Sequence, residues 1–292
     1  MQQNQKTQLL ANRAETEHFS RLNDYFIRSK LGYNLLLGGA KHFGFHPNGI
    51  KVSERRAITL MQDIVAEKLK LKTGMNVLDA GCGQGVVATY LAKKYSCKIN
   101  GITIVPFEID CANKISKKRK ISHLTNFSLM DYSKMSFPDN HFDAIFTLET
   151  LSHALYLEKT LREIFRVLKP NGKIAFFEYT VASDTQFTKH EMRIVRQIAH
   201  ISAMTSLYKF KHTKFSKRLK ETGFVNIKTE NITKNVTPTL KRFYKLARVP
   251  YIFVKITKSQ EKFPNITAAV EFYRMSKKGL FQYNIFTAEK TK

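Results

Sequence analysis

The sequence feature that most limits the fold is a short apolar segment that runs into a glycine-rich loop. Residues 76–80 are apolar enough for a buried strand, residues 81–85 contain three glycines, and residues 86–94 have helical spacing. Glycine lets backbone N–H groups approach a ligand, and the helix that follows adds its positive dipole end. Asp79 closes the strand, where a carboxylate without a partner is costly. The segment therefore predicts a ligand site.

The spacing of the glycines argues against a dinucleotide as that ligand. The dinucleotide fingerprint is G-x-G-x-x-G, with an acidic residue about 20 positions later. Here Gly85 comes one position too early for the third glycine, and Thr103 ends the next expected strand, where the acid would be needed. A nicotinamide-dependent enzyme is therefore the less favoured interpretation.

Strand and helix patterns alternate after residue 76, which is typical of a mostly parallel sheet covered by helices. Seven strands are expected, at residues 76–80, 98–104, 126–130, 143–148, 173–179, 224–230 and 280–288. The main helices between them are expected at residues 84–95, 107–119, 155–167, 191–204 and 214–222. We predict an α/β fold: a Rossmann-like, doubly wound, mostly parallel seven-stranded sheet with an N-terminal helical lid and a C-terminal helical insertion.

The chain divides by pattern into three parts, residues 1–70, 71–230 and 231–292. The first holds two expected helices, at 15–30 and 52–69, with Ser53 as an N-cap. Between them, residues 31–48 are rich in glycine and aromatic residues and lack a clear period, so we interpret them as a lid. Pro170, Asn171 and Gly172 predict a helix stop and a turn. The third part predicts a helix at 237–258 that breaks near Pro250, a helix at 266–278, and the closing strand.

The charge is strongly positive and uneven. The protein has 49 Lys and Arg against 23 Asp and Glu, a net charge of +26, and most of the excess lies after residue 180. Such a surface suits an anionic membrane, an acidic substrate or nucleic acid, or is simply solvated. Residues 192–201 and 239–253 combine basic and apolar side chains, as interfacial helices do.

The expected location is the cytoplasm, at the periphery of a membrane. No apolar run is long enough to span a bilayer, and the polar N-terminus does not resemble a signal peptide. The three cysteines lack the C-x-x-C spacing and are interpreted as reduced thiols. His18, His42 and His46 lack a carboxylate or a third nearby ligand, so we expect no metal site.

Several motifs together resemble one enzyme family. D-A-G-C-G-Q-G, from Asp79 to Gly85, resembles motif I of the S-adenosylmethionine (SAM) methyltransferases with a Rossmann-like sheet. F-P-D-N-H-F-D at 137–143 resembles a turn of the small-molecule methyltransferases. The motifs E-T-L-S-H-A at 149–154, E-I-F-R-V-L-K-P at 163–170 and F-E-Y at 177–179 most resemble the sterol C-methyltransferases that act on the sterol side chain. Tocopherol- and ubiquinone-type methyltransferases are similar, and G-I-T at 101–103 resembles the cyclopropane fatty acid synthases. The resemblance covers roughly residues 30–230.

The resemblance implies SAM as the cofactor and S-adenosylhomocysteine as the product. The cofactor-binding residues that it implies are Asp79, Gly81, Cys82, Gly83, Thr103, Ile104, Glu108, Asp131 and Tyr132. Thr103 replaces the usual acid that binds the ribose hydroxyls, which leaves these contacts to Thr103 or Glu108. Asp131 would face the adenine amino group. The residues alone are also consistent with other interpretations: Glu108 as a solvated acid in the first turn of a helix, and Asp131 as an ordinary turn residue.

The activated methyl group requires alignment of a nucleophile and exclusion of water, without a metal. Addition to an alkene leaves a carbocation, which a carboxylate can stabilise and a base can deprotonate. The candidates, in order, are Glu149, His153 one helical turn later, and Glu178. His153 also suits a hydrogen bond in the core, and Glu149 also suits a role in orienting SAM.

Aromatic residues and histidines around these acids are the candidates for the substrate pocket: Tyr33, His42, Phe45, His46, Phe177 and Tyr179. Phe177 and Tyr179 alternate with Glu178, so all three cannot share one face of a strand. We predict methyl transfer to carbon of a hydrophobic small molecule of the sterol, prenyl/terpenoid or quinone-like type. The alternatives are an N- or O-methyltransferase of the phosphoethanolamine type, a nucleic-acid methyltransferase and a non-catalytic SAM-binding scaffold. Against nucleic acid, the sequence lacks both the Asn/Asp-Pro-Pro-aromatic motif and a Pro-Cys dipeptide.

Overall fold

A seven-stranded sheet forms the centre of the molecule, in the order β3-β2-β1-β4-β5-β7-β6. The structure is a computed structural model that describes the backbone of residues 2–291 and the side chains from residue 13 onward. The strands are β1 (Asn76–Ala80), β2 (Lys98–Thr103), β3 (Thr125–Leu129), β4 (Phe142–Leu148), β5 (Leu168–Val181), β6 (Phe224–Asn231) and β7 (Phe281–Lys290). β1 to β5 pair in parallel, and β7 is antiparallel to both β5 and β6. The predicted α/β fold with a mostly parallel sheet is confirmed.

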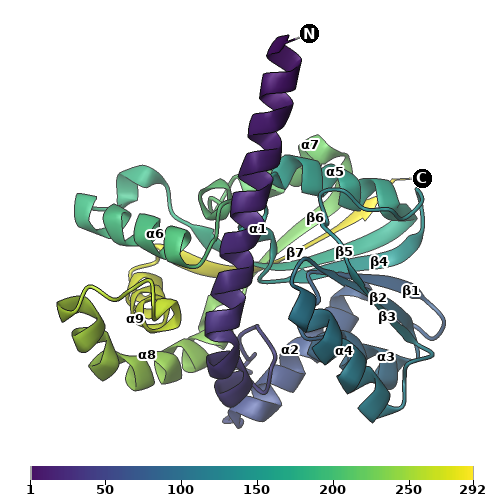
Figure 1. Cartoon of the computed structure of the whole chain (residues 1–292). Helices are drawn as coiled ribbons and strands as arrows, with labels where there is room; N and C mark the ends of the chain where they lie inside the picture. Colours follow the sequence, from purple (N-terminus) through teal and green to yellow (C-terminus); the bar gives the residue numbers. More distant parts are fainter. Residues whose placement is uncertain (1, 292) are drawn as a thin grey trace.

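Helices cover both faces of the sheet (Figure 1). The helices are α1 (Gln2–Leu37), α2 (Glu54–Leu69), α3 (Val86–Tyr95), α4 (Pro106–Arg119), α5 (Leu157–Val167), α6 (Lys189–Ile201), α7 (Phe215–Thr222), α8 (Thr233–Ile256) and α9 (Pro264–Lys277). α5 and α7 pack on one face, where Leu161 and Leu219 join the core with Phe286 of β7. α2 and α3 pack on the other, where Met61 and Leu91 join a second core. The sheet is therefore a buried layer between two helical layers.

The N-terminal helix is longer than the sequence predicted. α1 continues to Leu37, so the first part of the expected lid is helical. Gly38 and Gly39, with φ of 61° and 83°, follow the end of the helix. α1 also contacts α9, where Ser29 Oγ donates a hydrogen bond to Asn265 Oδ1 at 3.2 Å. The predicted N-cap of α2 is confirmed: Ser53 Oγ accepts from the Arg56 N–H at 3.3 Å.

Two proline-based expectations are wrong in detail. α8 runs unbroken from Thr233 to Ile256 with Pro250 inside it. Proline removes one helical hydrogen bond, but the packing of Ala247 and Tyr251 against α9 holds this turn. The helix stop predicted at Pro170, Asn171 and Gly172 is confirmed, because α5 ends at Val167, but the predicted turn lies within β5. Asn171 has φ of 61° there, and the pairing with β4 shifts register around it.

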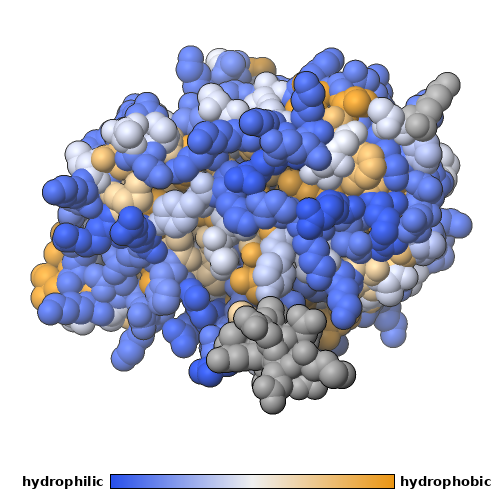
Figure 2. All heavy atoms as spheres, turned by 90° about the horizontal axis from the view of Figure 1, so that it is seen from above, coloured by the Kyte–Doolittle hydropathy of each residue, from blue (hydrophilic) through white to orange (hydrophobic). Residues whose placement is uncertain are grey.

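Residues at the carboxyl ends of β1, β2 and β4 line the same cavity as residues of α1, α8 and α9. Ligands in open α/β sheets bind at this edge. In Figure 1, α1 crosses the middle of the view, and α8 and α9 lie at the lower left. Figure 2 shows a mainly hydrophilic face with smaller apolar areas. Among residues 2–291, no helix is both long and apolar enough to cross a bilayer.

Replacement of Phe176 by alanine tests how strongly the central strands hold the fold. Phe176 in β5 is fully buried opposite Phe286. We expect Phe176→Ala to lower the free energy of unfolding by about 3–5 kcal/mol, because the truncation leaves a cavity. The matched change Leu129→Ala, at a residue that is 58% exposed, should cost less than about 0.5 kcal/mol. Urea unfolding followed by circular dichroism measures both. Equal losses in the two variants would contradict the assigned core.

Candidate functional site

One cavity of about 400 Å³ runs from the glycine loop to the helices above it. Every cofactor-binding residue expected from the sequence lines it: Asp79, Gly81, Cys82, Gly83, Thr103, Ile104, Glu108, Asp131 and Tyr132. Further walls come from α1, α8, α9, the segment after α6, and residues 39–43 and 146–156. The ends of the parallel strands and the helical cap therefore enclose one shared space.

The end of β1 presents an unpaired carboxyl oxygen to a ligand, and the loop after it presents bare backbone. Gly83 has φ of 50°, and a Cβ there would lie 3.6 Å from Lys41 Cδ and 4.0 Å from Glu108 Oε1. Asp79 is 3% exposed, and its Oδ2 has no hydrogen-bond partner among the described residues. Burial raises the pKa of Asp79 well above its ordinary value. A cationic ligand group would supply the missing partner, so the loop fits SAM, whose methionine end carries an ammonium and a sulfonium.

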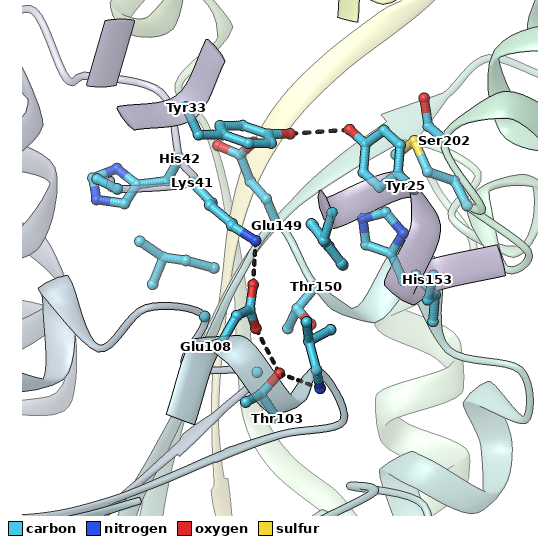
Figure 3. A pocket seen from close by; sticks show the side chains of 18 of the residues that line it. Tyr25, Tyr33, Lys41, His42, Thr103, Glu108, Glu149, Thr150, His153 and Ser202 are labelled. Carbon is cyan, nitrogen blue, oxygen red and sulfur yellow. Dashed lines mark hydrogen bonds and ion pairs between the residues drawn. The ribbon is translucent and has the colours of Figure 1, made fainter. Parts of the chain in front are cut away.

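Thr103 and Glu108 act together at the end of β2. Thr103 Oγ1 donates a hydrogen bond to Glu108 Oε2 at 2.7 Å, and Lys41 forms an ion pair with Glu108 Oε1 (Figure 3). Glu108 is 2% exposed, which excludes a solvated first-turn position. Both residues line the cavity, so either one could hold the ribose hydroxyls.

Lys41 is a residue that the sequence analysis missed. Its ammonium lies 3.7 Å from the ring centroid of Phe26 and 5.5 Å from that of Tyr33, as well as beside Glu108. Burial lowers the pKa of Lys41, and the charge of Glu108 acts in the opposite direction. The sequence signal for a role of Lys41 was its position as a single lysine among glycine and aromatic residues. The structure shows that this lysine connects α1, through Phe26 and Tyr33, to Glu108 at the cofactor end of the cavity.

Asp131 forms a local turn at the end of β3. Its Oδ1 accepts from the Ser133 N–H at 2.8 Å, and its Oδ2 accepts from Ser133 Oγ at 2.7 Å. The neighbouring Tyr132 donates from its hydroxyl to the Thr150 carbonyl at 3.2 Å. Asp131 thus forms a turn and also lines the cavity, so its expected contact with the adenine amino group stays a prediction.

Glu149 lies at the centre of the cavity wall, directly after β4. It adopts φ of 54°, and its carboxyl accepts three hydrogen bonds. The donors are the Phe43 N–H at 2.7 Å and the Tyr283 hydroxyl at 2.9 Å to Oε1, and the Tyr179 hydroxyl to Oε2. Removal from bulk water raises the pKa of Glu149 to about 8, although Phe43 and Tyr283 favour the ionised form. The group can therefore change its protonation state near neutral pH.

His153 reaches the cavity by a different geometry from the expected helical turn. The segment from Leu151 to His153 is a single 3-10 turn, so Glu149 and His153 are not paired on one helix face. His153 Nδ1 lies 3.2 Å from the Ala203 carbonyl oxygen, and its ring lies 5.4 Å from that of Phe26. Burial lowers the pKa of His153 to about 4, so the ring is neutral at neutral pH. It lines the cavity as an uncharged group (Figure 3).

Four candidates lie outside the lining of the cavity. They are Glu178, Phe45, His46 and Phe177. Glu178 is fully buried, and its Oε1 accepts from the Thr150 and Leu151 N–H groups at 2.8 and 2.7 Å. Glu178 therefore supports the turn that carries His153 and does not face a substrate. His46 instead binds Thr239 Oγ1, with its Nε2 at 3.2 Å.

The other pocket candidates, Tyr33, His42 and Tyr179, do line the cavity. The Tyr33 and Tyr25 hydroxyls lie 3.0 Å apart (Figure 3). Burial lowers the pKa of His42 to about 4, so this ring is also uncharged at neutral pH. Sequence analysis missed the aromatic walls from distant elements: Phe26 of α1, Phe243 of α8 and Phe272 of α9. Only the fold brings these residues to the site. In the part of the protein that the structure describes, no cluster of His, Cys, Asp or Glu side chains could hold a metal ion.

Comparison with known proteins agrees with this arrangement. Residues 78–176 match the family model described as a methyltransferase domain. The S-adenosyl-L-methionine-dependent Diels-Alderase iccD of Talaromyces variabilis is 32% identical over 256 residues, which are 84% of this chain and 86% of that protein.

A second relative matches about half of this chain. The sterol 24-C-methyltransferase erg6 of Aspergillus fumigatus is 34% identical over 141 residues, which are 48% of this chain but only 37% of that enzyme. Among solved structures, the [4+2]-cyclase SpnF superposes with a TM-score of 0.75 at 25% identity, covering 92% of this chain and 95% of that one.

The role of Asp79 can be measured as cofactor affinity. We expect Asp79→Asn to weaken SAM binding at least about tenfold, because it removes the buried negative charge next to the cationic methionine end. Isothermal titration calorimetry measures the dissociation constant. Asp143→Asn is the matched control, since Asp143 lies outside the cavity, where it pairs with Lys169 at 2.6 Å. Unchanged affinity in Asp79→Asn would show that the cofactor binds elsewhere.

Proposed function

The chain belongs to the class I SAM-dependent methyltransferases, and on that premise we propose that it methylates a carbon atom of a lipidic small molecule. The acceptor classes proposed are sterols, terpenoids or prenyl compounds, and quinone-like lipids. The observation that carries the proposal is the Glu149 carboxyl, which lies in the wall of a mainly apolar cavity with a pKa raised to about 8.

The character of the cavity supports a hydrophobic acceptor. Its upper walls are apolar and aromatic residues from three helices: Phe19, Leu22, Phe26, Leu36, Leu240, Phe243, Leu246 and Phe272. The charged groups Asp79, Glu108 and Lys41 gather at the cofactor end. A phosphoethanolamine-type acceptor would need a polar pocket for its headgroup, which these walls do not offer. A lipidic acceptor is the better match.

The proposed chemistry assigns separate tasks to the protein groups. Bound SAM supplies an electrophilic methyl group. The aromatic walls exclude water and hold an acceptor double bond in line with that group. Formation of the new carbon–carbon bond leaves a positive charge on the neighbouring carbon. The ionised Glu149 stabilises this charge, and loss of a proton to Glu149 or to the neutral His153 restores a double bond.

A second candidate is a SAM-dependent cycloaddition. It is supported by the relative that matches over most of both sequences, which is named as a Diels-Alderase, whereas the sterol methyltransferase match spans under half of this chain. The same enclosed apolar cavity would serve to fold a polyene, and this reaction needs no base. The two functions differ in cofactor consumption: methyl transfer forms one S-adenosylhomocysteine per product, and cycloaddition leaves SAM intact.

The site of action proposed is the surface of a membrane, where lipidic acceptors are concentrated. The basic surface supports this placement, since anionic lipids attract clustered Lys and Arg. The cytoplasmic location expected from the cysteines stays a prediction.

Replacement of Glu149 tests the proposed chemistry directly. We expect Glu149→Gln to lower kcat about 100-fold with little change in SAM affinity, because the amide cannot accept a proton. Wild-type activity should rise with pH through about 8, since the ionised form is the active one, and the variant should lose that rise. The assay follows label from methyl-labelled SAM into sterol, prenyl and quinone lipids dispersed in detergent.

Tyr283→Phe is a control for the pH dependence. Its hydroxyl favours the ionised Glu149, so its removal should shift the pH profile upward while kcat at high pH is kept. A Glu149→Gln enzyme with the wild-type rate and profile would refute the role of this carboxyl. Formation of product without S-adenosylhomocysteine would select cycloaddition.

A further inference from the structure

The outer side of α8 carries a row of exposed large apolar residues. Leu246, Val249, Ile252, Phe253 and Ile256 are between 54% and 73% exposed. Their spacing of three and four residues places them on one side of the last three helical turns. We call these five residues the α8 stripe.

The stripe is not needed for packing within the protein. α8 uses a different side, with Ala247 and Tyr251, to contact Val270 of α9, and these three residues are buried. No described part of the protein covers the stripe, because its residues remain more than half exposed. Contiguous exposed apolar surface of this kind marks a docking surface.

The charge around the stripe restricts the partner. α8 contains six Lys and Arg and no acidic residue over Thr233–Ile256. Lys245, Arg248 and Lys255 alternate with the stripe, and none of the three forms an ion pair with a described acidic residue. Lys258 and Lys262 follow in the loop before α9. An apolar row flanked by cations suits a surface that is negatively charged outside and apolar beneath.

The stripe borders the cavity. Leu246 belongs to the stripe and also lines the cavity, as does Pro250 on the same helix. Ile266 of α9 and Tyr33 of α1 line the same cavity. Leu246 is therefore shared by the stripe and the cavity wall. A lipid that leaves a membrane in contact with the stripe would reach the cavity wall at this residue.

We propose that the α8 stripe docks the protein on an anionic membrane, with the apolar residues among the lipid tails and the lysines and arginines at the headgroups. This is how interfacial amphipathic helices bind. Lipid transfer past Leu246 into the cavity rests on the proposed function; the docking itself does not.

Two other partners fit the stripe less well. Nucleic acid would be held by the basic residues alone, because phosphates make no use of five exposed apolar residues. A second copy of the protein would bring two clusters of Lys and Arg together, and like charges oppose such contact. The anionic membrane uses both the apolar and the basic groups.

Vesicle sedimentation tests the docking without SAM or acceptor. We expect the protein to bind vesicles rich in phosphatidylserine at low salt, to bind phosphatidylcholine vesicles weakly, and to dissociate at high salt. The double variant Phe253→Ser, Ile256→Ser keeps the charge and should bind about tenfold more weakly, because it removes the inserting residues. Both residues are exposed, so the fold should remain.

Two matched charge variants distinguish binding at the stripe from general electrostatic attraction to the membrane. Lys245→Gln with Arg248→Gln should weaken binding more than Lys117→Gln with Lys118→Gln on α4, although both pairs remove two charges. Absence of vesicle binding by the wild type, full binding by the serine variant, or equal losses in the two charge pairs would overturn the proposal. A concentration-dependent dimer that the serine variant abolishes would overturn it as well and assign the stripe to a second copy. Methylation of detergent-dispersed lipid tests the catalytic proposal separately.

Discussion

A carboxyl group at the end of β4 joins three distant parts of the protein. Glu149 accepts hydrogen bonds from the lid at Phe43, from β5 at Tyr179 and from β7 at Tyr283. Burial of a carboxylate costs free energy unless donors surround it, so these three segments must be in place together. Phe43 and Tyr179 also line the cavity, so the same contacts hold this part of its wall in place. The arrangement that makes the site therefore also fixes the relation of the cap to the sheet.

The core of this site could be predicted from sequence because it is local. Motif I places strand, loop and helix within a few residues, and Asp79, Gly81 and Gly83 line the cavity as expected. The strands also followed from short apolar runs, and the seven-stranded sheet is confirmed. Glycine spacing and apolar runs act over short distances in the sequence, which is why a single sequence reveals them.

The rest depends on contacts between distant residues. Spacing suggested that Glu149 and His153 share a helix face, but a left-handed backbone at Glu149 and a 3-10 turn replace the helix. Glu178 lies behind the wall, where it binds backbone N–H groups that the sequence does not reveal. Lys41 became visible only when its partner Glu108, far along the sequence, was placed beside it.

The position of β7 has a consequence for how the enzyme matures. β7 lies between β5 and β6, although it follows both in the sequence. During synthesis on a ribosome, the edge of β5 therefore stays unpaired until residues 281–290 emerge, and an open strand edge invites contact with other polypeptides. Tyr283, which completes the shell of Glu149, arrives in the same step. Acquisition of a competent active site is thus tied to closure of the sheet.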